Sequence, residues 1–222
     1  LRRQRQMCIR DRIICASTLF PVAWLLCLGL PSYEDLTSVE DSPAFVIPQL
    51  PVKLICICVF AFGITIIEGA MADWASVYVK EMLGPDALGT GYGFGLFAAF
   101  MALGRFFGDS LKIKLGTILV SRVFVITSIL GLIFLVIAND LWLALAGFAL
   151  IGLGVSVGFP LAVTAVASID DKREASYVAF LSLIALIGFL VGPPIIGFLA
   201  NMTNLKTGLT MLFPGLLLSL FM

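Results

Sequence analysis

The sequence of 222 residues contains no histidine. This absence removes haem ligation by histidine, most zinc sites and the most common general base of enzymes. Charged residues are also scarce, because Asp, Glu, Lys and Arg together make up only 13% of the chain. A soluble domain usually carries about a quarter of its residues as charges. With 60% apolar residues, the composition indicates an integral membrane protein.

Cysteine and basic residues are placed where they exclude further classes of protein. Cys15, Cys27, Cys56 and Cys58 lie inside apolar runs, and the last two lack the C-x-x-C spacing of metal and redox sites. Five of the 14 basic residues and one of the 14 acidic residues lie at positions 1–12, so the remainder has 9 basic and 13 acidic residues, net −4. We therefore predict no nucleic-acid surface, no metal and no cofactor.

Seven apolar runs approach or exceed the roughly 20 residues that a membrane-spanning helix needs. They cover residues 13–30, 54–79, 89–111, 115–138, 141–168, 175–200 and 205–222. Most connections are short and polar, which is typical of antiparallel neighbouring helices. The exception is 31–53, with four acidic residues and four prolines, which we interpret as a linker between two bundles. The predicted fold class is an all-α membrane protein with six to seven spans.

Lysine and arginine in the short connections predict the orientation in the membrane. On the side of the linker 31–53 lie Lys53, Lys112, Lys114, Lys172 and Arg173, whereas the opposite side has Lys80 and Lys206. The positive-inside rule therefore predicts a cytoplasmic linker.

The arginine-rich segment LRRQRQMCIRDR at 1–12 contradicts this orientation. If 13–30 spans the membrane, the five arginines of segment 1–12 lie on the outer face. Either 13–30 does not span, or the segment is foreign to the protein. Residues 2–12 match the translation of a transposase-based sequencing adapter throughout, so we predict that 1–12 are a read-through artefact. Coding DNA that differs from the adapter would contradict this prediction.

Two acidic residues, Glu68 and Asp73, lie within the apolar run 54–79. Ionisable groups in hydrocarbon cost free energy and usually mark a substrate pathway or a proton relay. At 100° per residue they lie at the edges of an arc of about 140° whose other members are small or polar: Thr65, Gly69, Ala72 and Ser76. We predict that Glu68, Asp73 and Thr65 line a substrate or proton pathway. The alternative is structural, with a paired carboxylate or, for Asp73, a place in the outer headgroup layer.

The run 89–111 ends in a charged cluster, GRFFGDSLKIKLG. Arg105 and Asp109 are four residues apart and can pair on one helix face, and Gly104 and Gly108 have the G-x-x-x-G spacing. The stretch 112–116 then predicts a tight charged hinge between two antiparallel helices. We predict a cytoplasmic gate formed by Arg105, Gly108 and Asp109, with ordinary anchoring of a helix end as the alternative.

Glycine and proline predict close packing and hinges in the spans. Four glycine pairs have the spacing that lets helices approach closely: Gly91 and Gly95, Gly104 and Gly108, Gly154 and Gly158, Gly188 and Gly192. Proline removes a backbone donor and kinks or breaks a helix, so we predict a helix break at Pro193 and Pro194 and another at Pro160. The predicted packing and hinge residues are Gly154, Gly158, Pro160, Gly188, Gly192, Pro193 and Gly197. Static packing explains them as well as movement does.

The order of these motifs resembles the C-terminal six helices of a major facilitator superfamily transporter, with the bacterial sugar-permease-like branch most similar. The motifs are the acidic linker, EGAMADW, GRFFGDSLKIKLG, GLGVSVGFP and GFLVGPPIIG. The resemblance covers 54–222, with 13–30 as the last helix of the N-terminal half. The loop signature of the family falls on Gly108, Asp109, Lys112, Lys114 and Gly116, but Ser110 replaces the usual arginine. A signature similar to that of antiporters falls on the penultimate span instead of the diagnostic one.

This resemblance implies half of a twelve-helix fold and secondary transport of a small polar, sugar-like solute by alternating access. The implied partners are the solute, a coupling proton or other ion, the lipid bilayer of the bacterial inner membrane, and the missing N-terminal half of the same protein. We expect the chain to be a fragment that is inactive alone. The alternative is a multi-span structural or assembly subunit without transport. An enzyme is disfavoured, because histidine and a spaced acidic motif are absent.

Overall fold

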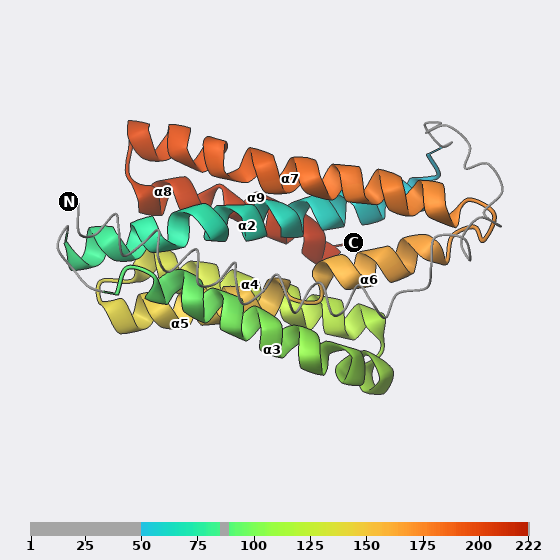
Figure 1. Cartoon of the computed structure of the whole chain (residues 1–222), viewed down its shortest axis with the longest axis horizontal. Helices are drawn as coiled ribbons and strands as arrows, with labels where there is room; N and C mark the ends of the chain where they lie inside the picture. Colours follow the sequence, from blue (N-terminus) through green and yellow to red (C-terminus); the bar gives the residue numbers. More distant parts are fainter. Residues whose placement is uncertain (1–49, 85–88, 222) are drawn as a thin grey trace, which may run out of the picture. The chain divides into compact units, whose positions relative to one another are not determined.

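The computed structural model describes residues 50–84 and 89–221. The segment 1–12, the predicted span 13–30 and most of the predicted linker 31–53 lie outside the described residues. The helices are α2 (Val52–Leu83), α3 (Tyr92–Leu115), α4 (Thr117–Ile137), α5 (Leu141–Val155), α6 (Gly158–Ala167), α7 (Glu174–Met202), α8 (Leu205–Thr210) and α9 (Leu212–Phe221). The described elements are all helices, so the predicted all-α membrane fold is confirmed (Figure 1).

Six helical stretches correspond to the six apolar runs between 54 and 222. Four are long and apolar enough to cross a membrane on their own: Val52–Leu83, Thr117–Ile137, Leu141–Ala167 and Glu174–Met202. Two shorter apolar stretches, Tyr92–Gly108 and Leu205–Leu220, complete the set within the described part of the chain. α2 begins two residues before the predicted position 54, directly after Pro51, because a proline is tolerated where the backbone donor would be unpaired.

The junction between α3 and α4 differs from the predicted hinge at 112–116. Lys112 and Lys114 lie within the last turn of α3 and not in a connecting loop. The turn consists of Gly116 alone, whose φ of 81° favours glycine. Positive charge is favourable at the C-terminal end of a helix, which explains how α3 continues through the two lysines.

The span 141–167 is interrupted between α5 and α6, at Ser156 and Val157. The interruption lies three to four residues before Pro160. A proline has no N–H, so the carbonyl of the residue four positions earlier loses its helical donor. In this span that residue is Ser156. The physical cause of the interruption is therefore present in the sequence.

α7 is continuous, so the helix break predicted at Pro193 and Pro194 is not found. Contacts from α2 support the affected part of α7. Trp74 Nε1 donates a hydrogen bond of 3.0 Å to the carbonyl oxygen of Pro193. The carbonyl of Phe189 has no helical donor, because Pro193 lacks an N–H. This carbonyl lies against the backbone of Gly69. The neighbouring helix thus stabilises a segment that would be weak in isolation.

Glycines bring α7 and α2 into close contact along their length (Figure 1). A Cβ atom added at Gly188 would lie 2.5 Å from Thr65 Oγ1, and one at Gly192 would lie 2.5 Å from the carbonyl oxygen of Ile66. Gly197 lies against the ring of Trp74 in the same way, at 2.9 Å. The two helices could not approach as closely with larger residues at these positions.

The other glycine pairs differ among themselves. Gly154 packs against the carbonyl oxygen of Phe124 on α4, at 2.5 Å from an added Cβ, and Gly158 packs against Ile64 on α2, at 2.9 Å. An added Cβ at Gly91 or Gly95 would meet no described heavy atom within 4 Å. The close packing predicted for this last pair is therefore not found within the described residues.

Two long polar side chains satisfy carbonyls at the C-terminal end of α4. The buried Tyr78 donates a hydrogen bond of 2.5 Å from its hydroxyl to the carbonyl oxygen of Leu135. Lys206 Nζ donates to the carbonyl oxygen of Ala138. The last carbonyls of a helix have no partner within the helix, so these bonds attach α4 to α2 and α8.

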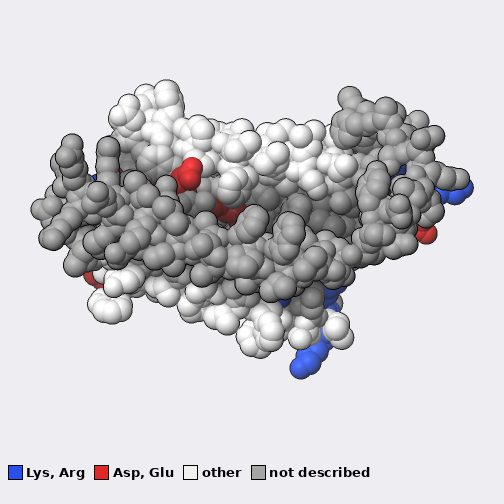
Figure 2. Space-filling view, viewed as in Figure 1, with Lys and Arg blue, Asp and Glu red and all other residues white. Residues whose placement is uncertain are grey.

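Charged side chains are scarce on the visible described surface (Figure 2). Most of the visible blue atoms lie in the right-hand half, one group at the bottom, where α3 ends in Figure 1, and another at the right-hand edge, where α6 connects to α7. α2 begins with Lys53 near one end of the helices, and Lys112 and Lys114 end α3 at the same end, because consecutive spans are antiparallel. The predicted orientation depends on this unequal distribution of lysine and arginine between the two ends of the spans.

Candidate functional site

Glu68 and Arg105 form an ion pair between α2 and α3. Arg105 Nη2 lies 3.8 Å from Glu68 Oε1, and the side chains are 50% and 15% exposed, respectively. Oε1 of Glu68 is buried and has no hydrogen-bond partner among the described residues. A separation of 3.8 Å is too long for a hydrogen bond. Charge alone therefore holds the pair, and both groups retain unused hydrogen-bonding capacity.

Arg105 also contacts the interruption between α5 and α6. Its Nε donates a hydrogen bond of 3.3 Å to the carbonyl oxygen of Ser156. This is the carbonyl that Pro160 leaves without a helical donor. Gly104, one residue before Arg105, lies against the side chain of Ser156 and allows α3 to approach. One arginine therefore connects the carboxylate of Glu68 to the interruption of another span.

The ion pair lines a hollow of about 330 Å³ between α2, α3 and α7. Glu68 and Arg105 are its polar residues. The other seven lining residues are alanine, phenylalanine or methionine: Ala72, Phe94, Phe97, Ala98, Met101, Ala102 and Phe189. An apolar wall with a few placed polar groups is typical of a small-molecule site. This hollow is the candidate substrate site.

The structure does not place Thr65 or Asp73 in this hollow. Thr65 is buried, and its hydroxyl donates a hydrogen bond of 3.0 Å to a carbonyl one turn earlier in α2. Asp73 is exposed and lines a separate hollow of about 360 Å³. Phe189 lines both hollows and lies between them in the wall formed by α7. Of the three predicted pathway residues, Glu68 alone lies in the hollow with Arg105.

A smaller hollow of about 210 Å³ lies next to Arg105, toward the C-terminal end of α3. Its lining residues come from α3 and the α5–α6 region: Arg105, Gly108, Lys112, Val157, Pro160, Leu161 and Thr164. An added Cβ at Gly108 would meet the side chain of Val157, so this glycine permits close contact with the interruption. The side chain of Asp109, the predicted partner of Arg105, lies outside the described residues. Arg105 borders both hollows, between Glu68 and Lys112.

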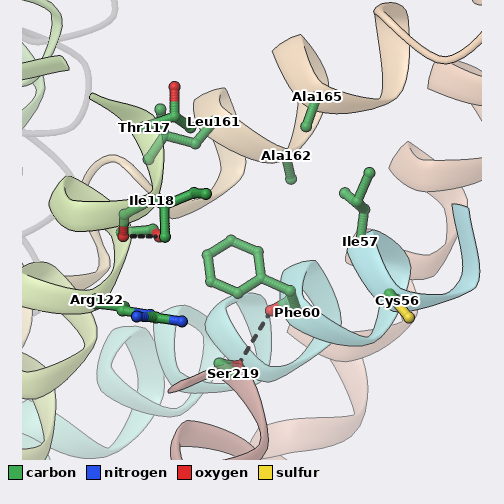
Figure 3. A pocket seen from close by; sticks show the side chains of 11 residues that line it. Cys56, Ile57, Phe60, Thr117, Ile118, Arg122, Leu161, Ala162, Ala165 and Ser219 are labelled. Carbon is green, nitrogen blue, oxygen red and sulfur yellow. Dashed lines mark hydrogen bonds between the residues drawn. The ribbon is translucent and has the colours of Figure 1, made fainter. Parts of the chain in front are cut away.

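A further hollow, of about 160 Å³, is lined by α2, α4, α6 and α9 (Figure 3). Arg122 points toward Phe60 and Ser219 in this view. Ser219 Oγ lies 3.5 Å from the carbonyl oxygen of Phe60, within hydrogen-bond reach. No lining residue is acidic, and none is shared with the hollow of Glu68. The ion pair therefore distinguishes the candidate substrate site from this space.

The sequence profile of the Major Facilitator Superfamily matches residues 13–222. The chain belongs to this superfamily. It is accordingly an integral, multi-pass membrane protein of a transporter family. The matched residues include every described helix and the predicted span 13–30.

Curated relatives of this superfamily member are transporters or membrane proteins of bacteria. An uncharacterized MFS-type transporter of Yersinia pestis is 32% identical over 167 residues, which cover 75% of this chain and 43% of the relative. An uncharacterized transporter of Sinorhizobium fredii, y4wD, is 28% identical over 77% of this chain and 45% of its own length. Membrane protein MosC of Rhizobium meliloti is 30% identical over 71% of this chain and 39% of its own length. The chain thus spans less than half the length of these relatives. No solved structure matches it.

Sequence reasoning missed Ser156 and the aromatic wall of the hollow. The signal for Ser156 was present, because Pro160 predicts an unpaired carbonyl four residues earlier. Phe94, Phe97 and Phe189 carry no such signal, since phenylalanine is common throughout the spans. Among the described residues, no cluster of three Cys, Asp or Glu side chains offers a metal site.

Proposed function

We propose that this chain forms one six-span bundle of a secondary transporter that moves a small solute across the bacterial inner membrane by alternating access. The observation that carries the proposal is the ion pair of Glu68 and Arg105 within an otherwise apolar hollow. Charged groups inside a membrane protein are expensive and usually mark a substrate or ion pathway. A structural subunit would not need such a pair.

Glu68 is the proposed proton-binding group. Arg105 is the one cationic side chain that the described residues place within 4.0 Å of its carboxylate. α5 and α6 contain no titratable residue, and those of α7, Glu174 and Tyr177, lie near its start. Asp73 lies further along α2 and lines a different hollow. Proton binding at Glu68 therefore acts first on Arg105.

Arg105 is the proposed connection between proton binding and movement. Protonation of Glu68 removes the charge that attracts the guanidinium, while the bond from Arg105 to Ser156 remains available. Arg105 can then shift toward the interruption between α5 and α6. In this proposal the interruption and the end of α3, with Gly108 and Asp109, form the gate on the side of Lys112. The excess of positive charge at this end of the bundle favours a cytoplasmic location for the gate, on the same side as the linker 31–53.

A second bundle of the same protein is the proposed partner. The hollow is open on the side where Phe94 and Phe189 are 41% and 40% exposed. The relatives are more than twice as long as the part that this chain matches. An N-terminal bundle would close this side and supply the rest of the substrate site, as inverted and parallel repeats do in secondary transporters.

The test compares Glu68→Gln with Glu81→Gln in the two-bundle protein, reconstituted in liposomes. Glu81 is an exposed residue of α2 and lines no part of the hollow, so it is a matched control. We expect Glu68→Gln to abolish uptake driven by a proton gradient but to retain solute exchange, because glutamine cannot bind and release a proton. Glu81→Gln should behave as the natural protein. Unchanged proton-driven uptake in Glu68→Gln would exclude Glu68 as the coupling group.

A further inference from the structure

The walls of the substrate hollow are poorly suited to a sugar. Seven of the nine lining residues offer no hydrogen-bonding side chain, and the other two, Glu68 and Arg105, neutralise each other. A hydroxyl group that leaves water without a new hydrogen bond costs about 1–3 kcal/mol in a protein. A solute with many hydroxyls would leave several of them against phenylalanine, methionine and alanine. This bundle therefore favours a solute with an apolar body.

Arg105 offers a place for one negative charge. A guanidinium has five N–H donors in a planar fork that matches a carboxylate. In Arg105 one donor is used by the carbonyl of Ser156, and the contact with Glu68 is too long to be a hydrogen bond. The side chain is 50% exposed, so an entering group can reach it. A solute carboxylate that binds Arg105 at hydrogen-bond distance would replace the looser contact of Arg105 with Glu68 by a closer one.

We propose that the transported solute is an amphipathic organic monoanion, with its carboxylate on Arg105 and its apolar body between Phe94, Phe97 and Phe189. This inference rests on the proposed transport function and specifies its substrate class. Flat aromatic and flexible methionine side chains suit an aryl or alkyl body.

Charge balance then links the solute to the proton. Without solute, the negative Glu68 neutralises Arg105. When the carboxylate of the solute takes this place, Glu68 loses its partner and binds a proton, so one anion and one proton enter the site together. The sum of charges in the site stays at zero throughout. Lys112, with Arg105 in the smaller hollow, offers the anion a second positive group toward the end of α3.

The test uses the two-bundle protein in liposomes, with radiolabelled 3-phenylpropanoate, its neutral amide 3-phenylpropanamide, and D-glucose as probes. The neutral acid form of the anion and the amide cross bilayers unaided, so uptake is measured as the excess over protein-free liposomes. We expect this excess for the anion alone, driven by a pH gradient and unaffected by membrane potential. Arg105→Gln should weaken its apparent affinity by about ten- to a hundredfold, the loss of a hydrogen bond to a charged group. Arg122→Gln, which removes a cation outside this hollow, should change it by less than about twofold.

A second variant keeps the substrate proposal testable if Arg105→Gln does not fold. Lys112→Gln, at the end of α3, should raise the apparent KM for the anion by about two- to fivefold, the effect of one partly exposed charge. Equal transport of the amide, transport of glucose, or an anion affinity unaffected by both variants would overturn the substrate class while transport itself stands. Failure to move any probe, with no proton movement, would overturn the proposed function and this inference with it.

Discussion

Gly192 is the position where a single methyl group should separate α7 from α2. A Cβ added there would lie 2.5 Å from the carbonyl oxygen of Ile66 and 3.0 Å from its Cγ1. A carbon normally lies about 3.3 Å or more from a carbonyl oxygen, so the backbones must move apart by about 0.8 Å. Overpacking of this kind costs about 1–3 kcal/mol. Both contacts are with a neighbouring helix, so rotation of a side chain cannot relieve the clash with the carbonyl.

The matched control is Gly95→Ala on α3, where an added Cβ meets no described heavy atom within 4 Å. Both substitutions change glycine to alanine inside a helix, so the gain in helix propensity cancels in the comparison. At about 2–4 °C per kcal/mol for a chain of this length, Gly192→Ala should unfold about 2–12 °C below Gly95→Ala. The assay is thermal unfolding of the purified chain in detergent, followed by tryptophan fluorescence. Equal unfolding temperatures would refute the close approach of the two backbones.

Two further predictions concern carbonyls that depend on a distant donor. Tyr78→Phe leaves the carbonyl of Leu135 without the hydrogen bond from Tyr78, so we expect the unfolding free energy to fall by about 1–3 kcal/mol. The measurement is equilibrium unfolding in mixed detergent. An unchanged free energy would contradict the role of Tyr78 at the end of α4. Arg105→Gln should destabilise the natural sequence more than the Pro160→Ala background, because an alanine at 160 restores an N–H that can serve Ser156. A double-mutant cycle should give a coupling of at least about 0.5 kcal/mol, and strict additivity would show that Arg105 and Pro160 do not act on the same carbonyl.

The fold was largely predictable, because hydrophobic run length dominates in a membrane protein. The six runs between 54 and 222 appear as helical stretches at nearly the predicted positions. The errors lie where a local rule competed with a tertiary contact. α3 continues through Lys112 and Lys114, because Gly116 alone makes the turn. α7 continues through Pro193, where Gly69 and Trp74 of α2 pack against it.

The candidate site was predictable only in part. The cost of a charge in hydrocarbon singled out Glu68, and the structure places it in a hollow. The same rule also selected Asp73, which lines a different hollow from Glu68. Helical periodicity assigned both carboxylates to one arc, but it could not show that Phe189 of another helix lies between their two hollows.

The sequence by itself determined the class of protein, the six helical stretches between 54 and 222 and the few costly charges within them. These properties follow from composition and from local backbone chemistry, which act over tens of residues at most. Only the tertiary structure decided which groups meet. The sequence pairs Arg105 with Asp109, four residues away, whose side chain lies outside the described residues. The structure adds two contacts that the sequence does not indicate: Arg105 lies beside Glu68, 37 positions earlier, and donates a hydrogen bond to the carbonyl of Ser156, 51 positions later. Partners of this kind depend on how α2, α3 and α5 pack, and packing depends on the shapes of all the side chains at once.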